Sequence, residues 1–315
     1  MFNKISIIIP TWKRTKKLKK VLYSLSNQTI HKNNYEIIVI SSALQKIRKN
    51  HENIRFFNVP FNSNAIKRNL GLKVKKYPNV IFLDDDCVPS SNFIFEYMRV
   101  IPFLSNKQII CGTVKYNSLL KSKNKYIQLR ENSHFQIKRK DFTKKKINLL
   151  TPATIVTMNM GFKVPKNLGY FRFDEKFGGY GFEDYEFGFR MINKGYDFIK
   201  GYPKIYHMDD RNINKYYSKF YYLGYEASKI FRKINLNAFR STNYYKLEKF
   251  FGFKNVVLCK MVSYLLILLI SLVNIFNKIN GFKSNKFFKL SLILNYILGH
   301  VCRYGNLNLN RRWYS

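Results

Sequence analysis

The feature that most restricts the fold of this chain is the alternation of short β-branched runs with amphipathic segments over its first 115 or so residues. Such runs predict strands at residues 5–9, 36–40, 55–59, 80–83 and 109–117. Between them, apolar residues recur at helical spacing at 18–25 and again at 65–74. The pattern predicts βαβ units, which form a mostly parallel sheet with helices on its faces. Ligands of such sheets bind at the carboxyl ends of the strands.

Acidic residues are scarce and clustered. The 315-residue chain has 18 Asp+Glu against 56 Lys+Arg, yet ten of those acids fall at 84–86, 174–175, 183–186 and 209–210. The triplet Asp84-Asp85-Asp86 directly follows a predicted strand. Neighbouring carboxylates raise one another's pKa unless a cation lies among them. Mg²⁺ and Mn²⁺ prefer oxygen ligands, so the triplet predicts a site for a divalent metal and a diphosphate. The alternative is a solvated turn or a helix cap.

A second acidic cluster follows a glycine-rich loop in "GGYGFEDYEFGFR". It places Glu183 and Asp184 at the start of a helix predicted at 183–194. The N–H groups and dipole of a helix N-terminus favour negative charge, so a carboxylate here stays ionised and could act as a general base toward a hydroxyl group. Simple capping of the helix is the alternative interpretation.

The net charge of +38 favours partners that carry phosphates, either nucleic acid or an anionic membrane. The sequence contains no recognised nucleic-acid-binding module, and we expect no nucleic acid partner. Abundant Lys, Asn, Ile, Phe and Tyr also fit a genome rich in A/T codons. The four cysteines are widely separated, which favours a reducing compartment. The apolar run at the N-terminus is too short for a secretory signal, so we expect a cytoplasmic catalytic part.

The composition changes at about residue 211, after which 18 Lys+Arg face two acids. Apolar residues at helical spacing predict an amphipathic helix at 213–234. Residues 261–276 are uncharged, and 290–298 form a shorter apolar run. Spanning a bilayer takes about 20 residues, and a spanning hairpin would carry lysines outward, against the positive-inside tendency. We therefore predict helices that lie in or re-enter an anionic membrane surface. A buried helical pair is the alternative.

Together these motifs resemble family 2 glycosyltransferases of the GT-A fold. The resemblance rests on "ISIIIPTWKR", "NAIKRNLGL", the Asp triplet as a D-x-D motif, and "GYFRFDEKFGGYGFEDYEFGFR", the last being similar to galactosyltransferase and chondroitin-polymerase types. It spans roughly residues 3 to 208 and implies a catalytic domain at 1–210, with a helical, membrane-associating region at 211–315. The implied activity is inverting, metal-dependent transfer from a nucleotide sugar, expected to be a UDP-sugar, to a glycan or lipid-linked acceptor in surface polysaccharide synthesis. The implied place is the inner face of a bacterial cell membrane, to which the protein attaches peripherally.

The resemblance also implies roles for individual residues. Asp184 is the expected catalytic base, and Glu183 helps to orient the acceptor. Asp86, Asp84 and His207 are the expected ligands of Mn²⁺ or Mg²⁺. The nucleotide sugar is expected to contact Pro10, Thr11, Arg14, Arg68, Asp84 and Asp85.

One position departs from the family pattern. Members usually have an Asp after the second strand that reads the uracil base, and this chain has Ser41 and Ser42 there. The hydroxyls could replace the carboxylate, or base recognition could be altered. A chain without activity is a further interpretation, which keeps a non-catalytic carbohydrate-binding or scaffold protein of the same fold as the alternative function.

Overall fold

The computed structural model describes residues 4–13, 15–43, 52–116, 125–134, 149–208, 212–253, 255–279, 285–307 and 309. The chain divides into two compact units. Unit 1 comprises residues 1–120, 130–179 and 183–209. Unit 2 comprises residues 121–129, 180–182 and 210–315.

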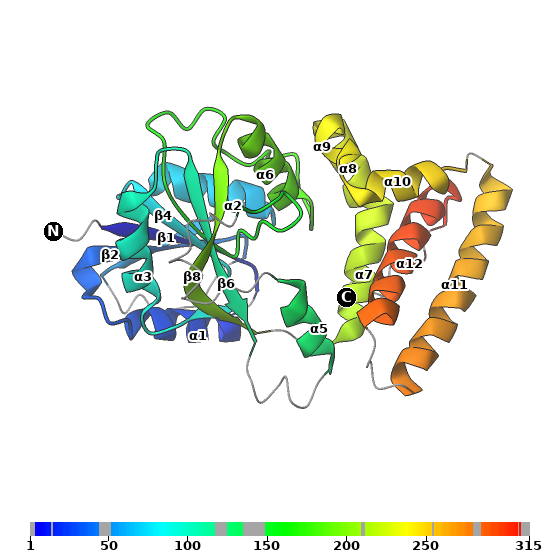
Figure 1. Ribbon diagram of the computed structural model, residues 1–315, viewed down its shortest axis with the longest axis horizontal. Coiled ribbons are helices and arrows are strands. Elements are labelled where there is room, and N and C mark those ends of the chain that lie inside the picture. The colour runs from blue at the N-terminus through cyan, green and yellow to red at the C-terminus, as the bar shows by residue number, and fades with distance from the viewer. Residues whose placement is uncertain are drawn as a thin grey trace. The chain divides into compact units, whose positions relative to one another are not determined.

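Unit 1 is built on an eight-stranded mixed sheet with the order β3-β2-β1-β4-β7-β6-β8-β5 (Figure 1). The strands are β1 (Ile5–Thr11), β2 (Tyr35–Ser41), β3 (Ile54–Asn58), β4 (Asn79–Leu83), β5 (Cys87–Pro89), β6 (Gln108–Lys115), β7 (Asn159–Lys163) and β8 (Asp197–His207). Strands β1 to β4 pair in parallel, whereas β7 pairs antiparallel with β4 and β6. The predicted mixed, mostly parallel sheet is therefore confirmed.

The direction of winding reverses at β1. The chain passes from β1 outward to β2 and β3, and then returns to add β4 on the other side of β1. Ligands of open α/β sheets bind at the carboxyl ends of the strands at such a reversal. Here those ends are Thr11 of β1 and the aspartate triplet after β4.

Helices cover both faces of the sheet in unit 1. They are α1 (Thr15–Ser26), α2 (Asn64–Val74), α3 (Phe93–Val100) and α6 (Glu183–Asn193), with short 3₁₀ turns at Lys32–Asn34 and Ile101–Phe103. Figure 1 shows α1 and α2 on opposite faces. Helix α2 packs closely on β1, because a Cβ added at Gly71 would lie 2.4 Å from Cγ2 of Ile8. A further helix, α5, spans Lys125–Ser133.

Two features of unit 1 lie outside the strands predicted above. Thr151–Ile155 form a turn, and β7 begins after it at Asn159. The antiparallel pair β5 and β8 was not predicted. Strand β5 has only three residues, too few to show a period-2 pattern.

Unit 2 is helical. Its elements are α7 (Ile213–Tyr222), a π-helical turn η4 (Leu223–Ala227), α8 (Ser228–Ile234), α9 (Leu236–Arg240), α10 (Asn243–Phe250), α11 (Val256–Ile279) and α12 (Asn285–Tyr304). The first three form the predicted helix at 213–234, with one widened turn. Helix α12 lies between α7 and α11 (Figure 1).

Candidate active site

Both acidic clusters of unit 1 meet at the guanidinium group of Arg68. This side chain projects from α2 and is 2% exposed. Its Nη2 lies 3.2 Å from Oδ1 of Asp84, and its Nη1 lies 3.3 Å from Oδ1 of Asp184 and 3.6 Å from Oε1 of Glu183. The guanidinium also lies over the ring of Phe173, 5.3 Å from the centroid. One cation thus joins carboxylates that are about a hundred positions apart in the sequence.

The pKa values in this cluster follow from burial and mutual charge. Burial alone would lower the pKa of Arg68, but the charges of Asp184, Asp84 and Glu183 outweigh it and raise the pKa. Burial raises the pKa of Asp84 to about 6 against the opposing effect of Arg68. Burial, followed by the charge of Asp184, raises the pKa of Glu183 to about 7. Arg68 therefore stays charged, while protonation of Glu183 takes place near neutral pH.

Asp184 lies in the first turn of α6, after two residues with positive φ, Gly181 at 99° and Phe182 at 69°. Its Oδ1 accepts hydrogen bonds from Arg68 Nη1 and from Thr157 Oγ1, the latter at 2.8 Å. Thr157 is fully buried. The Asp184 side chain is 33% exposed, and within the described part of the chain its hydrogen bonds all end on Oδ1. Its Oδ2 is thus the carboxylate oxygen available to a bound hydroxyl.

Asp85 has a different partner from its neighbour Asp84. The hydroxyl of Thr11, at the end of β1, donates to Oδ2 of Asp85 at 2.6 Å, and both side chains are buried. Pro10 precedes Thr11 within the same strand. Three residues expected to contact the nucleotide therefore lie together at the point where the sheet reverses its winding. Arg14, also expected there, lies outside the described residues.

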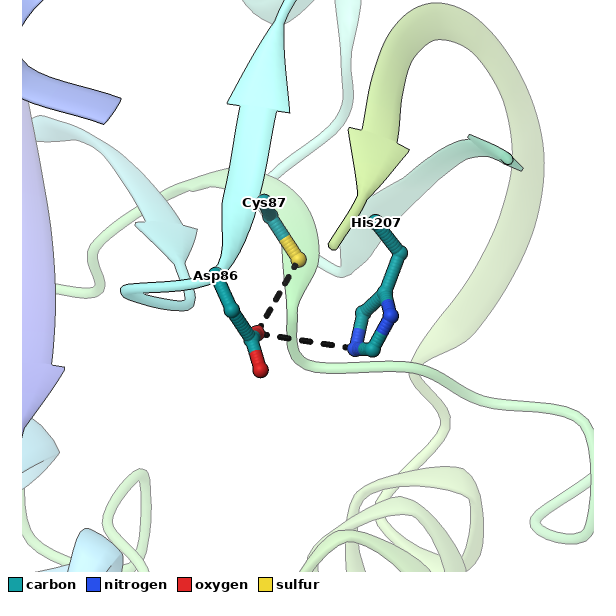
Figure 2. Close-up of side chains that lie close together, drawn as sticks. All are labelled: Asp86, Cys87 and His207. Carbon is teal, nitrogen blue, oxygen red and sulfur yellow. Dashed lines mark hydrogen bonds and ion pairs between the residues drawn. The ribbon is translucent and has the colours of Figure 1, made fainter. Parts of the chain in front are cut away.

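The third aspartate, Asp86, lies beside His207 and Cys87 (Figure 2). Oδ1 of Asp86 is 3.5 Å from Nε2 of His207 and 3.8 Å from Sγ of Cys87. Strand pairing builds this group, because Cys87 of β5 is in register with His207 of β8. The ring of Tyr116 packs against the imidazole, with centroids 5.4 Å apart. Lys17 of α1 lies 3.9 Å from Oδ2 of Asp86 and donates to the carbonyl of Met208 at 2.7 Å.

These residues fit a divalent cation. Their three ligand atoms all lie within 4.8 Å of one another. A carboxylate and an imidazole provide hard and intermediate donors, and phosphate and water oxygens commonly complete such a set. Burial, followed by the charge of Asp86, raises the pKa of the Cys87 thiol well above its usual range, which makes it the weakest donor of the three. Asp84, the other expected carboxylate ligand, forms an ion pair with Arg68.

The loop that contains Tyr170, Arg172 and Phe173 precedes α6 and is held by side chains of α2 and α6. Asn69, next to Arg68 on α2, donates to the carbonyl of Phe173 and accepts from its N–H, both at 2.9 Å. Arg190 of α6 binds both oxygens of Glu186 and donates to the carbonyls of Tyr170 and Arg172. The loop thereby holds Phe173 beneath the guanidinium of Arg68.

Ser41 and Ser42, at the end of β2, do not form a charged site. Ser41 Oγ donates to the carbonyl of Ala43, and Ser42 Oγ donates to Oδ1 of Asn62 at 3.1 Å. The same Oδ1 accepts from the buried Lys67 at 2.7 Å. The amide oxygen of Asn62 therefore joins Ser42 to Lys67 beside the end of β2.

Three residues of the site were not identified from the sequence, namely Lys17, Cys87 and Thr157. Lys17 had a usable signal, since it lies in the first turns of the helix that follows β1. Cys87 directly follows the triplet. Thr157 had no local signal, because only the fold brings it to Asp184.

Comparison with known proteins agrees with this geometry. A family model described as "Glycosyl transferase family 2" matches residues 6–164. Over 93 residues, or 27% of this chain, the sequence is 36% identical to poly(ribitol-phosphate) beta-N-acetylglucosaminyltransferase TarP of Staphylococcus aureus (strain N315). Over 242 residues, or 61% of this chain, it is 28% identical to chondroitin synthase of Escherichia coli. The matched regions cover only 28% and 32% of these two relatives.

Among solved structures, the mannosyltransferase PcManGT from Pyrobaculum calidifontis, in complex with GDP-Man and Mn²⁺, is similar with a TM-score of 0.59. The match covers 98% of this chain and 89% of the other at 13% sequence identity. At that identity the similarity shows a common fold.

Proposed function

This chain belongs to glycosyl transferase family 2 as a glycosyltransferase of the GT-A fold, and from that premise we propose the reaction it performs. It transfers a sugar from a nucleotide-diphosphate donor to a hydroxyl group of a glycan or lipid-linked acceptor, with inversion at the anomeric carbon. The donor we propose is a UDP-sugar, in line with the resemblance to galactosyltransferase and chondroitin-polymerase types. The observation that carries the proposal is the meeting of the two acidic clusters at Arg68.

On the donor side, Asp85 and Thr11 provide fixed polar groups where the sheet reverses its winding. Asp86 and His207 would hold a Mn²⁺ or Mg²⁺ ion, which when bound neutralises charge on the diphosphate leaving group. Lys17 adds a positive charge beside Asp86 on the same side. The neighbour PcManGT was solved with both a nucleotide sugar and Mn²⁺, which supports this arrangement.

On the acceptor side, Asp184 is the base that removes a proton. Arg68 and Thr157 both bind Oδ1, so the carboxylate cannot turn freely and Oδ2 is left for the acceptor. A hydroxyl group that donates to Oδ2 becomes a better nucleophile as its proton leaves.

The two sides support inversion. A base on one side of the anomeric carbon and a leaving group on the other give a single displacement, with a transition state resembling the oxocarbenium ion of glycoside hydrolysis. Glu183 lies beside the base and takes up or releases a proton near neutral pH, which suits a group that hydrogen bonds to the acceptor.

We place this reaction in the synthesis of a bacterial surface polysaccharide, at the inner face of the cell membrane. Two curated relatives support that setting, one a poly(ribitol-phosphate) beta-N-acetylglucosaminyltransferase and the other a chondroitin synthase. The positive charge of residues 211–315 would favour an anionic membrane surface.

The test compares donor binding and turnover in three forms of the protein. A panel of nucleotide diphosphates and nucleotide sugars is screened by thermal shift with and without Mn²⁺, and sugar transfer is followed by mass spectrometry. Asp86→Asn should lose the Mn²⁺-dependent part of donor binding. Asp184→Asn should bind donor normally and lose turnover by a factor of about 10² to 10⁴. Normal transfer by Asp184→Asn would place the base elsewhere, and binding without turnover in the wild-type chain would favour the non-catalytic alternative.

A further inference from the structure

Helix α11 forms the outer layer of unit 2 and packs on α12 along one narrow seam (Figure 1). Its buried positions alternate at spacings of four and three and comprise Cys259, Ser263, Leu266, Ile270, Val273 and Asn277. The remainder of its circumference faces outward. No charged residue occurs between Lys260 and Lys278, a distance of roughly 27 Å at 1.5 Å per residue.

The outward face of α11 is apolar along its whole length. Large apolar side chains that are 40% exposed or more occur at Val256, Val257, Leu258, Met261, Tyr264, Leu265, Leu268, Leu269, Leu272, Ile275, Phe276 and Ile279. Apolar residues of α12 are also exposed, among them Phe287, Leu290 and Ile293. An apolar patch of this extent on a protein surface marks a binding site for a partner or a membrane.

The seam between α11 and α12 contains the polar residues. Asn277 Nδ2 donates to Ser291 Oγ at 3.1 Å, and both side chains are buried. Cys302 Sγ donates to Ser263 Oγ at 3.4 Å, and Ser263 donates in turn to the carbonyl of Cys259. The exposed Ser271 also satisfies its hydroxyl within the helix, on the carbonyl of Ile267. The seam thus contains polar groups together with apolar ones, while the outward face carries large apolar side chains, unlike a helix pair in water, whose outer face is polar.

Two alternatives explain this arrangement less well. The first alternative is that α11 is the core helix of a soluble protein, which can be equally long and apolar. Such a helix is mostly buried, whereas only 22% of the most apolar 18-residue stretch of α11 is buried. The second alternative is that another copy of the chain packs against α11, which would cover only one stripe of its apolar residues. Here adjacent side chains are exposed together, Tyr264 with Leu265 and Leu268 with Leu269, so the face is wider than one stripe. Lipid covers such a surface from all directions.

We propose that α11 lies in the plane of the bilayer with its outward face immersed among the acyl chains. This deepens the membrane attachment proposed above and does not depend on which sugar is transferred. Lys260 and Lys278 are exposed near the two ends of the helix, where they reach anionic headgroups. Burial of apolar surface, rather than charge, is then the main source of affinity, so the attachment resists salt and yields to detergent.

A crossing orientation fits less well. Helix α12 lies against α11 and carries Lys286 and Lys289 in its first turns and Arg303 near its end. Thirteen residues separate Lys289 from Arg303, so its uncharged stretch of roughly 20 Å is shorter than the hydrocarbon core, which is about 30 Å thick. With α11 flat, these groups remain outside the acyl region.

The experiment is flotation of the full chain with vesicles made of equal parts phosphatidylcholine and phosphatidylglycerol. We expect the wild-type chain to float both at low salt and at about 1 M NaCl, where the Debye length is only about 3 Å. In the variant Leu265→Gln/Leu268→Gln/Leu272→Gln, the fraction bound at high salt should fall at least tenfold. The matched control, Lys246→Gln/Lys249→Gln, removes two charges of α10 and should change high-salt binding less than twofold.

Several results would overturn the proposal. Among them are release of the wild-type chain by high salt, flotation of the triple glutamine variant like wild type, and a lipid-free dimer that the same three substitutions dissociate. Donor binding and circular dichroism of the variants show that they are folded, so a failure of anchoring is distinct from a failure of the proposed reaction. Spin labels at positions 258, 265 and 272 should report equal depths, and depths graded along the helix would contradict the in-plane orientation.

Discussion

Oδ1 of Asp184 accepts hydrogen bonds from both Arg68 and Thr157, one from a helix beside the reversal point of the sheet and one from the segment before β7. The same guanidinium holds Asp84. Any movement of the donor-side aspartate relative to the proposed base must therefore displace Arg68. This makes the arginine a structural link between the two halves of the site as well as a charge within it.

Arg68→Met removes the charge and keeps most of the volume. Asp84, Glu183 and Asp184 then lose their common buried cation, and breaking a buried pair in this way costs about 3–5 kcal/mol. Urea unfolding at pH 7.5 or so measures the change. Arg68→Lys is the control, since it restores the charge without the forked geometry and should recover part of the loss. Wild-type stability in Arg68→Met would mean that the link is dispensable.

Glu183→Gln should make the free energy of unfolding less dependent on pH. The pKa of Glu183 is raised to about 7 in the folded chain, compared with about 4.3 when unfolded. The folded state thus holds this proton more tightly, so the stabilisation is complete below the unfolded pKa and is lost as pH rises through the folded one. Above pH 8 or so the variant should be more stable than wild type by as much as about 3 kcal/mol. A difference that does not shrink toward pH 4.5 or so would contradict this account.

Thr157→Val tests whether orientation of the base matters apart from its presence. The substitution keeps the shape of the side chain and removes the hydroxyl that donates to Asp184. We expect turnover to fall by roughly tenfold, corresponding to a lost hydrogen bond of about 1–2 kcal/mol, with donor affinity unchanged. Thr151→Val offers the control, because Thr151 is an exposed residue of the same segment whose hydroxyl contacts Thr154. Equal losses in both variants would indicate a general effect on folding.

The periodic elements of unit 1 could be predicted because their signals are local. The strands at 5–9, 36–40 and 80–83 and the helix at 65–74 all lie within elements of the structure. Apolar alternation and helical spacing are properties of a few consecutive residues, and burial on both faces of a parallel sheet strengthens them. The composition change near residue 211 similarly indicated the helical C-terminal region.

Which site residues contact one another could not be predicted, because these contacts depend on the topology of the sheet. Asp84 and Asp86 were both expected to bind the metal, and in the structure Asp84 contacts Arg68 whereas Asp86 contacts His207. The direction of a side chain in the turn after β4 depends on the antiparallel pairing of β5 with β8. That pairing joins residues 120 positions apart, and no local pattern predicts it. The proximity of Thr157 to Asp184 could not be predicted from the sequence for the same reason.

Gly224→Ala should destabilise unit 2. A Cβ at Gly224 would lie 2.0 Å from the backbone oxygen of Tyr296, and one at Gly299 would lie 2.0 Å from that of Tyr221. The two glycines thus let η4 and α12 approach with their backbones in contact, and a backbone carbonyl cannot turn aside as a side chain can. Overpacking of this kind costs about 1–3 kcal/mol, and Gly299→Ala should cost a similar amount. Gly178→Ala is the control, since no atom of the described residues lies within 4 Å of its added Cβ and its stability should stay within about 0.5 kcal/mol of wild type. Thermal unfolding followed by circular dichroism compares the three, and an unchanged midpoint in Gly224→Ala would show that the two helices can separate without cost.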